Sequence, residues 1–117
     1  MDIVEANKYC TFNKSAHLVE VLTQDQMDFF VMELEFLETH DGARNYWSGG
    51  TDWNREGQWY WANSLLPVED FVWHTGQPDG GLNGGNYLDF YSGFNYFGSD
   101  YPGTGNFYPI CQKPMTI

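Results

Sequence analysis

Basic residues are scarce in this sequence, and long apolar runs are missing from it. Five lysines and arginines stand against 16 aspartates and glutamates, so the formal net charge is −11. Such a charge repels nucleic-acid phosphates and anionic membranes, which makes both poor partners. No segment reads as a membrane span, and no signal peptide precedes the helical pattern that follows Met1. The chain is therefore expected to be either a mature fragment or a protein that stays in the cytosol.

Cysteine is almost absent, since the chain contains only Cys10 and Cys111. A bridge between them would close a loop of about 100 residues and stabilise the fold by ~4–5 kcal/mol in the chain-entropy model. Two free, buried thiols are the alternative. The sequence has no CxxC and no cysteine–histidine pattern at metal-binding spacing.

Histidine is also rare, and His17, His40 and His74 are scattered along the chain. None of them has the neighbours of a nucleophile-and-base pair, and the helical histidine motif of metalloenzymes is missing. We therefore expect no enzymatic activity.

The sequence does contain ample apolar material for one core. Its 117 residues are 42% hydrophobic and 19% aromatic, which predicts one β-rich globular domain and not a disordered acidic chain. Helical spacing predicts a short helix over residues 3–13, and an extended segment follows at 17–21. Thr23 and Gln26 form a capping-box signal for a second helix that runs to about Glu38. Its predicted apolar face consists of Met27, Phe30, Val31, Leu34 and Leu37.

The acidic residues of this second helix lie largely opposite its apolar face. They are Asp25, Asp28, Glu35 and Glu38. We interpret them as a solvated helix face, with a partner surface as the alternative.

From Tyr46 onward the pattern changes to β-structure. Segments 46–53 and 58–63 are predicted to be strands joined by a turn. The tryptophans of this region are predicted to pack in the core, and a sugar-stacking platform is the alternative. They are Trp47, Trp53, Trp59 and Trp61.

An aromatic hairpin is predicted further along, with strands at 86–92 and 94–97 and its turn at Gly93. A last strand over 107–113 carries Cys111. The order of helix, strand, helix and then strands only predicts an α+β fold.

The stretch 73–86, WHTGQPDGGLNGGN, is rich in glycine and lacks a regular apolar period. Apolar residues on both flanks anchor it in the core, so it is predicted to be a shaped loop. Gln77 and Asp79 carry side-chain oxygens on either side of Pro78, and rigid, convergent oxygens are what a hard cation or a sugar hydroxyl needs. The alternative is a surface loop in which this triplet is only a turn.

In their order and spacing, these segments resemble a C-type lectin-like domain over nearly the whole chain. The resemblance is carried by Tyr9-Cys10, YWSGGTDW (46–53), WYW (59–61), VWHTGQPDGG (72–81) and PICQKP (109–114). YWSGGTD, EGQWYW and QPD are especially similar to invertebrate members. The resemblance implies one domain over residues 1–117, with two helices, two small antiparallel sheets, a long ligand-site loop and a first strand that is missing or very short. It also implies a Cys10–Cys111 disulfide and a secreted protein whose signal peptide is not in this chain.

In calcium-dependent members of that family, the sugar site combines a QPD or EPN triplet, a glutamate before a loop cysteine, and a WND triplet. Gln77 and Asp79 match the QPD form, which goes with galactose-type selectivity. Counting back from Cys111 places Gly98-Ser99-Asp100 on the WND triplet. By resemblance, the calcium ligands are Gln77, Asp79 and Asp100. The carbohydrate-binding residues are Gln77, Asp79, Asn86, Ser99 and Asp100.

The sequence departs from the family pattern at several positions. Gly85 replaces the calcium-binding glutamate, and Ser99 replaces the asparagine of the WND triplet. Tyr87 and Gly103 stand at the positions of the two cysteines of the inner disulfide. One position has a large side chain and the other has none, so we expect Tyr87 to point inward and fill the space. Gln112 stands where a glutamate usually follows the last cysteine, which weakens a second, structural calcium site.

Two carboxylates with neutral oxygens predict a weak calcium site or none, unless Asn83, Asn86 or Asp89 contributes. The expected function is carbohydrate binding, with galactose-type sugars favoured, by a secreted module that does not insert into membranes or bind nucleic acid. The alternatives are a calcium-independent module that binds protein or another surface, and a structural role at a mineral or ice surface. An oligomer is compatible with this sequence.

Overall fold

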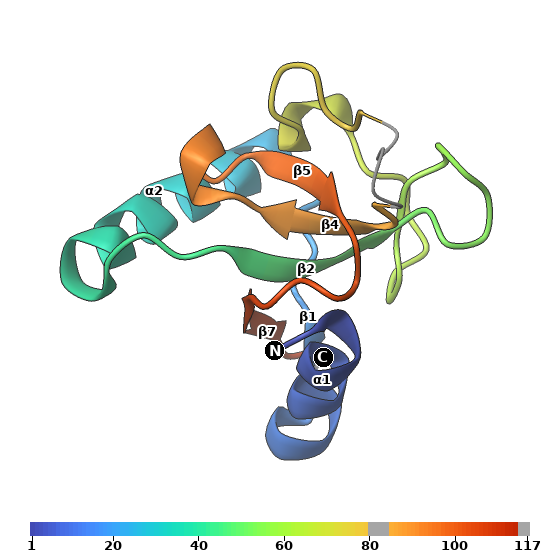
Figure 1. Cartoon of the computed structure of the whole chain (residues 1–117), viewed down its shortest axis with the longest axis horizontal. Helices are drawn as coiled ribbons and strands as arrows, with labels where there is room; N and C mark the ends of the chain where they lie inside the picture. Colours follow the sequence, from blue (N-terminus) through green and yellow to red (C-terminus); the bar gives the residue numbers. More distant parts are fainter. Residues whose placement is uncertain (80–84, 115–117) are drawn as a thin grey trace.

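The computed structural model describes residues 1–79 and 85–114, and it has the predicted order of elements. Helix α1 (Ile3–Lys8) continues into a π-helical turn (Tyr9–Asn13), and strand β1 (His17–Leu18) leads to the long helix α2 (Gln24–Asp41). The other strands are β2 (Tyr46–Thr51), β3 (Tyr60–Trp61), β4 (Tyr87–Phe90), β5 (Gly98–Tyr101), β6 (Tyr108–Pro109) and β7 (Cys111–Gln112) (Figure 1). Short 3-10 turns lie at Asp70–Val72 and Ser92–Phe94. The predicted α+β class is confirmed.

Both helices begin with reciprocal side-chain caps. The Asp2 carboxylate accepts a hydrogen bond from the backbone N–H of Glu5 at 2.8 Å, and the Glu5 carboxylate accepts one from the N–H of Asp2 at 3.0 Å. Thr23 and Gln26 cap α2 in the same way, as their spacing predicted. These local pairs satisfy backbone donors that would otherwise lack partners in the first helical turn.

Helix α2 extends beyond its predicted end, to Asp41, because the chain first leaves the helix at Gly42 with a φ of +81°. Met27 and Leu34 of its predicted apolar face are buried, whereas Leu37 is 38% exposed. The assignment of Leu37 to that face was therefore wrong, because at 3.6 residues per turn it lies at the margin of the stripe. No helix among residues 1–79 and 85–114 combines the length and apolar character needed to cross a bilayer.

The main sheet has the strand order β3-β2-β4-β5, and β6 runs parallel to β2. Figure 1 shows β2, β4 and β5 side by side in that order. The other neighbouring strands are antiparallel. β1 and β7 form a separate two-stranded antiparallel sheet. β5 is therefore the last strand in this order, and it lies next to the segment that enters the glycine-rich loop.

The second strand of the predicted hairpin was placed too early, because residues 94–97 belong to a turn and the partner of β4 is β5. Asn95 and Tyr96 have left-handed φ values of 53° and 68°. The N–H of Tyr96 donates to the carbonyl of Tyr91 at 2.9 Å. The buried Tyr96 ring then reaches α2, where its hydroxyl donates to Glu38 at 2.9 Å. This tertiary contact decides where the chain turns, so the aromatic pattern could not reveal it.

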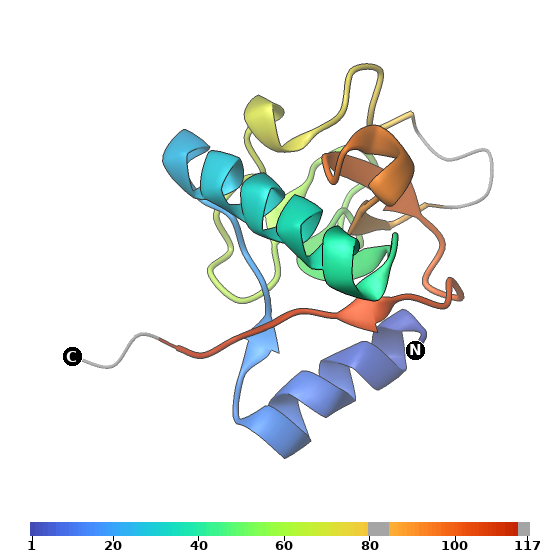
Figure 2. The same cartoon turned by 90° about the vertical axis from the view of Figure 1, so that its left-hand side faces the viewer.

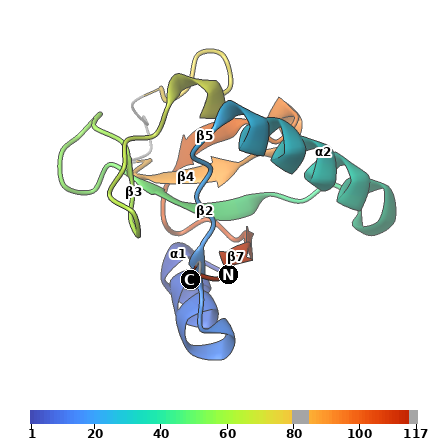
Figure 3. The same ribbon diagram turned by 180° about the vertical axis from the view of Figure 1, so that it is seen from behind.

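Different helices cover the two faces of the main sheet, and Figures 2 and 3 show α2 lying along the sheet and α1 below it. On the face toward α2, Leu88 and Phe90 of β4 share a buried cluster with Met27 of that helix. On the other face, Trp47 of β2 packs with Ile3, Ala6, Cys10 and Leu18. Successive residues of a strand point to opposite faces, so β4 serves both clusters.

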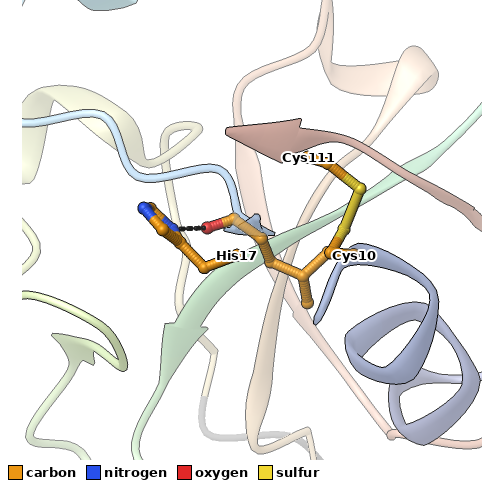
Figure 4. Close-up of a disulfide and its surroundings, with 4 residues drawn as sticks. Cys10, His17 and Cys111 are labelled. Atoms are coloured by element: carbon orange, nitrogen blue, oxygen red, sulfur yellow. Dashed lines mark hydrogen bonds between the residues drawn. A yellow bond between two sulfur atoms is a disulfide. The ribbon is translucent and has the colours of Figure 1, made fainter. Parts of the chain in front are cut away.

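A disulfide joins Cys10, in the turn after α1, to Cys111 of β7 (Figure 4). The implied pairing is therefore confirmed, and the alternative of two free thiols is wrong. Cys111 also pairs with Leu18 across the small sheet, and the Nδ1 atom of His17 lies 2.8 Å from the carbonyl oxygen of Leu18. The bridge thus ties the N-terminal helical segment to the last strand.

The tryptophans differ in their environments. Trp47 and Trp61 are fully buried and Trp59 is half-buried, as core packing predicted. Trp53 is 67% exposed, so its assignment to the core was wrong. β2 ends before Trp53, and the following turn carries its ring onto the ring of Tyr87, with centroids 6.3 Å apart.

Candidate functional site

The entry to the glycine-rich loop is held against the start of β5. Trp73 forms a bridge with Gly98, and the N–H of His74 donates to the carbonyl of Gly98 at 3.0 Å. The N–H of Gln77 donates back to the carbonyl of His74 at 2.9 Å, and the peptide bond between Gln77 and Pro78 is cis. The loop is therefore a shaped segment where it is described, as its anchored flanks predicted.

The same segment brings Asp79 next to Asp100 of β5. The backbone N–H of Asp79 donates to Oδ1 of Asp100 at 3.1 Å. The other carboxyl oxygen of Asp100, Oδ2, is buried and has no hydrogen-bond partner among the described residues. Burial raises the pKa of Asp100; the N–H of Asp79 partly opposes this rise, and the neighbouring Asp79 carboxyl adds to it. Two acidic groups held this close favour a cation or a proton between them.

These residues line a surface hollow of about 490 Å³ between the loop and β5. We call it the loop–β5 hollow and define it by Gln77, Asp79, Gly85, Ser99 and Asp100. Four of the five predicted carbohydrate-binding residues therefore come together. Asn86 is not among the described residues that line the hollow, and its carbonyl instead accepts a hydrogen bond from Thr51 Oγ1 at 2.7 Å.

Aromatic rings form another part of the same hollow, and the sequence alone did not assign them to it. Tyr91, Phe94 and Phe107 are among its lining residues. The ring of Phe94 stacks on His74, with 4.1 Å between centroids and an angle of 5° between planes. The aromatic run at 90–97 was the available signal, but it was interpreted only as a hairpin.

Gly85 lies where the family pattern has a glutamate, and its surroundings are tight. A Cβ atom at this position would be 3.0 Å from the carbonyl carbon of Asp100 and 3.1 Å from its Oδ2 atom. A side chain at position 85 would therefore sit directly beside Asp100. With glycine there, the hollow has no third carboxylate from this position.

Ser99 faces a buried acid. Its hydroxyl donates a hydrogen bond to Oδ1 of Asp89, which is fully buried and paired across the sheet with both Ser99 and Trp47. Burial raises the pKa of Asp89 to about 7, partly opposed by the Ser99 hydrogen bond. Asp89 does not line the loop–β5 hollow. Of the other residues considered as additional ligands, Asn83 lies outside the described residues.

The donor set fits calcium only in part. In favour of a cation are the two adjacent carboxyls and the unpartnered Oδ2 atom of Asp100. Against a strong site are Gly85 and the Ser99 hydroxyl that already donates to Asp89. Within residues 1–79 and 85–114, no three His, Cys, Asp or Glu side chains gather in a way that could hold a metal ion. Calcium gains affinity from carboxylate charge, so these residues fit a weak site.

The sequence matches the family described as "Lectin C-type domain" over residues 1–83. It is 31% identical over 115 residues to asialoglycoprotein receptor 1 of Rattus norvegicus, covering 94% of this chain and 34% of that protein. It is 34% identical over 113 residues to perlucin of Haliotis laevigata, covering 94% of this chain and 63% of that protein. The chain thus spans about a third of the length of the rat receptor.

Solved structures share the same architecture. Human lithostathine has a TM-score of 0.76 at 29% identity, covering 94% of this chain and 82% of that chain. The C-type carbohydrate-recognition domain of cow CD23 has a TM-score of 0.79 at 20% identity, covering 100% of this chain and 83% of that chain. The two helices, the two sheets and the loop over β5 are therefore a known arrangement.

Proposed function

The chain belongs to the C-type lectin domain family, and on that basis we propose that it binds carbohydrate through the loop–β5 hollow. The observation that carries the proposal is the meeting of Asp79 and Asp100, which are held together by a hydrogen bond of 3.1 Å at the edge of that hollow. Gln77 lines the same hollow, so an amide and two carboxyls face one ligand volume. Such convergent polar groups beside aromatic rings are typical of a small-molecule site.

Gln77, Asp79 and Asp100 are the residues that would hold a calcium ion. When bound, the ion would supply coordination for two neighbouring sugar hydroxyls. The carboxyl oxygens of Asp79 and Asp100 would accept hydrogen bonds from those hydroxyls, and the amide of Gln77 can donate or accept. Ser99, which lines the same hollow, would assist by accepting a hydrogen bond. The QPD triplet favours galactose-type sugars.

Tyr91 and Phe94 would contribute the apolar part of recognition. A pyranose ring has faces of C–H groups, and aromatic side chains provide large apolar surfaces with little conformational freedom. Both rings line the loop–β5 hollow and come from the turn after β4, where the Phe94 ring stacks on His74 at the entry to the loop. The hollow therefore offers polar atoms and apolar surface to the same ligand.

We further propose that the protein is secreted. The Cys10–Cys111 bridge is the supporting observation, because disulfides persist mainly in oxidising compartments. A binding role is proposed, and not catalysis, because the family consists of binding domains.

A calcium-independent binding module is the second candidate. It is favoured by Gly85, because glycine at the position of the family's calcium-binding glutamate removes one carboxylate ligand. A side chain at this position would be crowded against Asp100. The Oδ1 atom of Asp100 also already accepts a hydrogen bond from the backbone N–H of Asp79, which leaves it less available to an ion. In that case the same hollow would bind sugar, protein or another surface without the ion.

A glycan array, probed with calcium and again with a chelator, tests the two proposed modes of binding. Binding to galactose-type glycans that the chelator abolishes would support the calcium-dependent form. Glycan binding that survives the chelator would support the calcium-independent binding module. If no glycan is retained under either condition while the protein remains folded, the proposal of carbohydrate binding is wrong.

A further inference from the structure

The outer face of α2 carries large apolar side chains in solvent. Phe29, Met32 and Phe36 are 59%, 57% and 60% exposed. Their spacing of three and then four residues puts them on one side of the helix, and this side is opposite the buried Met27 and Leu34. We call these three residues the α2 outer stripe. Figure 2 shows α2 running along the outside of the domain, so this face points away from the sheet.

An outward helix face is normally polar, because only the face toward the core gains from burial. Here α2 is apolar on both sides. Seven residues separate Phe29 from Phe36, so the stripe spans about 10 Å along the helix axis. A contiguous exposed apolar patch of this kind marks an interaction surface more often than a free surface.

The charged side chains that α2 itself places beside the outer stripe are acidic. Helix α2 contains six acidic residues and no lysine or arginine. Three of the acids have partners within the chain. Glu38 accepts from the Tyr96 hydroxyl, Asp28 accepts from the side-chain amide of Gln24 at 2.9 Å, and Asp41 lies 4.0 Å from Arg44. The acids that flank the stripe are all exposed, namely Asp25, Asp28, Glu33 and Glu35.

We propose that the α2 outer stripe binds a cationic amphipathic helix of a partner protein. Apolar side chains at helical spacing on the partner would cover Phe29, Met32 and Phe36. Lysines or arginines beside them would face the flanking acids, which provides charge complementarity. A second copy of this chain would bring like charges together, and an anionic membrane would be repelled by the same acids.

This surface is separate from the proposed sugar site. No residue of α2 is among the described residues that line the loop–β5 hollow. The interaction would therefore not compete with a ligand in that hollow. Its test does not depend on sugar or calcium binding.

The test uses the disulfide-bonded protein and a synthetic leucine–lysine peptide of about 18 residues, with leucines at helical spacing. A scrambled peptide of identical composition controls for net charge, and a leucine–glutamate peptide tests the sign of the charge. Affinities are measured by calorimetry at about 50 and about 300 mM NaCl, because screening weakens charge pairing. We expect the helical leucine–lysine peptide to bind at least about tenfold more tightly than its scrambled form, and the glutamate peptide not to bind.

Variants then localise the binding. The triple variant Phe29→Gln, Met32→Gln and Phe36→Gln should lose the advantage of the helical peptide over the scrambled one. Glu33→Gln with Glu35→Gln should weaken binding several-fold and reduce its salt dependence. Phe12→Gln is the matched control, because Phe12 is 76% exposed and lies outside α2, and it should change nothing. Circular dichroism of each variant confirms that the fold is retained.

Three results would overturn the proposal. Equal binding of helical and scrambled peptides would mean that charge alone attracts them to an acidic protein. Equal binding by the native protein and the triple variant would place the peptide elsewhere. A dimer in sedimentation experiments that the triple variant abolishes would assign the stripe to a second copy of the chain.

Discussion

The ring of Tyr87 lies over Gly103, at the two positions where the family pattern has its inner disulfide. A Cβ atom at Gly103 would be 2.9 Å from Cε2 of Tyr87 and 2.7 Å from Cγ2 of Ile3. Tyr87 also meets the buried ring of Trp47 edge-on, with 6.4 Å between centroids. The large side chain occupies the space that the glycine leaves open. The prediction that Tyr87 points inward is therefore confirmed.

Replacing Tyr87 by alanine should lower the free energy of unfolding by about 3 kcal/mol, as expected for an aromatic ring that is partly buried against a core. The loss should appear in urea unfolding monitored by circular dichroism. Phe12→Ala is the control, because Phe12 is 76% exposed, and it should change stability by less than about 0.5 kcal/mol. A loss below about 1 kcal/mol for Tyr87→Ala would show that the ring contributes little to the core.

Removing the disulfide should be strongly destabilising. The bridge joins residues 101 positions apart, and opening so large a loop should cost ~4–5 kcal/mol in the chain-entropy model. We expect Cys10→Ser and the double variant Cys10→Ser, Cys111→Ser to lose similar amounts in urea unfolding. Intact mass should rise by two hydrogens after reduction. Detection of two free thiols in the unreduced, denatured protein would contradict the bridge.

Calcium should stabilise the protein only slightly. With two carboxylates in the loop–β5 hollow, we expect a Kd of ~10⁻⁴–10⁻³ M, or no binding. A Kd of about 1 mM would raise the free energy of unfolding by ~1.4 kcal/mol at about 10 mM calcium. Asp79→Asn and Asp100→Asn should each abolish this gain in a thermal-shift experiment.

The calcium-free forms of these two variants should be as stable as the native protein or slightly more stable. Each substitution removes one of two neighbouring acids, and burial and the Asp79 carboxyl already raise the pKa of Asp100. Glu35→Gln removes the same charge from an exposed position on α2 and should leave the calcium response intact. Micromolar calcium affinity in calorimetry would show that a further ligand completes the site.

Asp89 should make stability depend on pH. Its pKa is about 7 in the folded protein against an ordinary value of 3.8, because burial disfavours the charged form. The folded state therefore binds the proton more tightly than the unfolded state. Its contribution to stability is fully present below pH 3.8 and is lost as the pH rises through about 7.

The comparison with Asp89→Asn isolates this effect, because the other acids are common to both proteins. The stability of the variant relative to the native protein should rise between about pH 4 and 7, by on the order of 4 kcal/mol, and then level off. Urea unfolding at several pH values measures the difference. Replacing the carboxyl by an amide also changes the free energy of unfolding by an amount that does not depend on pH. Only the variation of the difference with pH therefore reports on Asp89. A difference that stays flat across this range would mean that Asp89 is not held in its neutral form.

Local features of the sequence were sufficient to predict both helices and their order with the strands. The capping pair Thr23 and Gln26 acts within one helical turn, so the start of α2 could be predicted without knowledge of the fold. The anchored loop around Gln77 was predicted from its apolar flanks and its lack of an apolar period. The pairing of Cys10 with Cys111 followed from the resemblance, because it depends on a shared order of segments.

Tertiary contacts decided the features that depend on distant partners. Residues 94–97 turn because Tyr96 is buried and bonded to Glu38, and Trp53 leaves the sheet because β2 ends before it. Residue type and spacing do not determine which face of a strand is covered, so the burial of Asp89 could not be predicted.

The candidate site shows the same division. The sequence by itself determined which side chains are available, Gln77, Asp79, Ser99 and Asp100, and the resemblance grouped them. Only the fold decided that Asp79 and Asp100, 21 residues apart, share a hydrogen bond while Asn86 turns its carbonyl toward Thr51. The reason is that the docking of the loop on β5 depends on backbone hydrogen bonds such as that from the N–H of His74 to the carbonyl of Gly98, and the backbone groups that make them are nearly the same in every residue type.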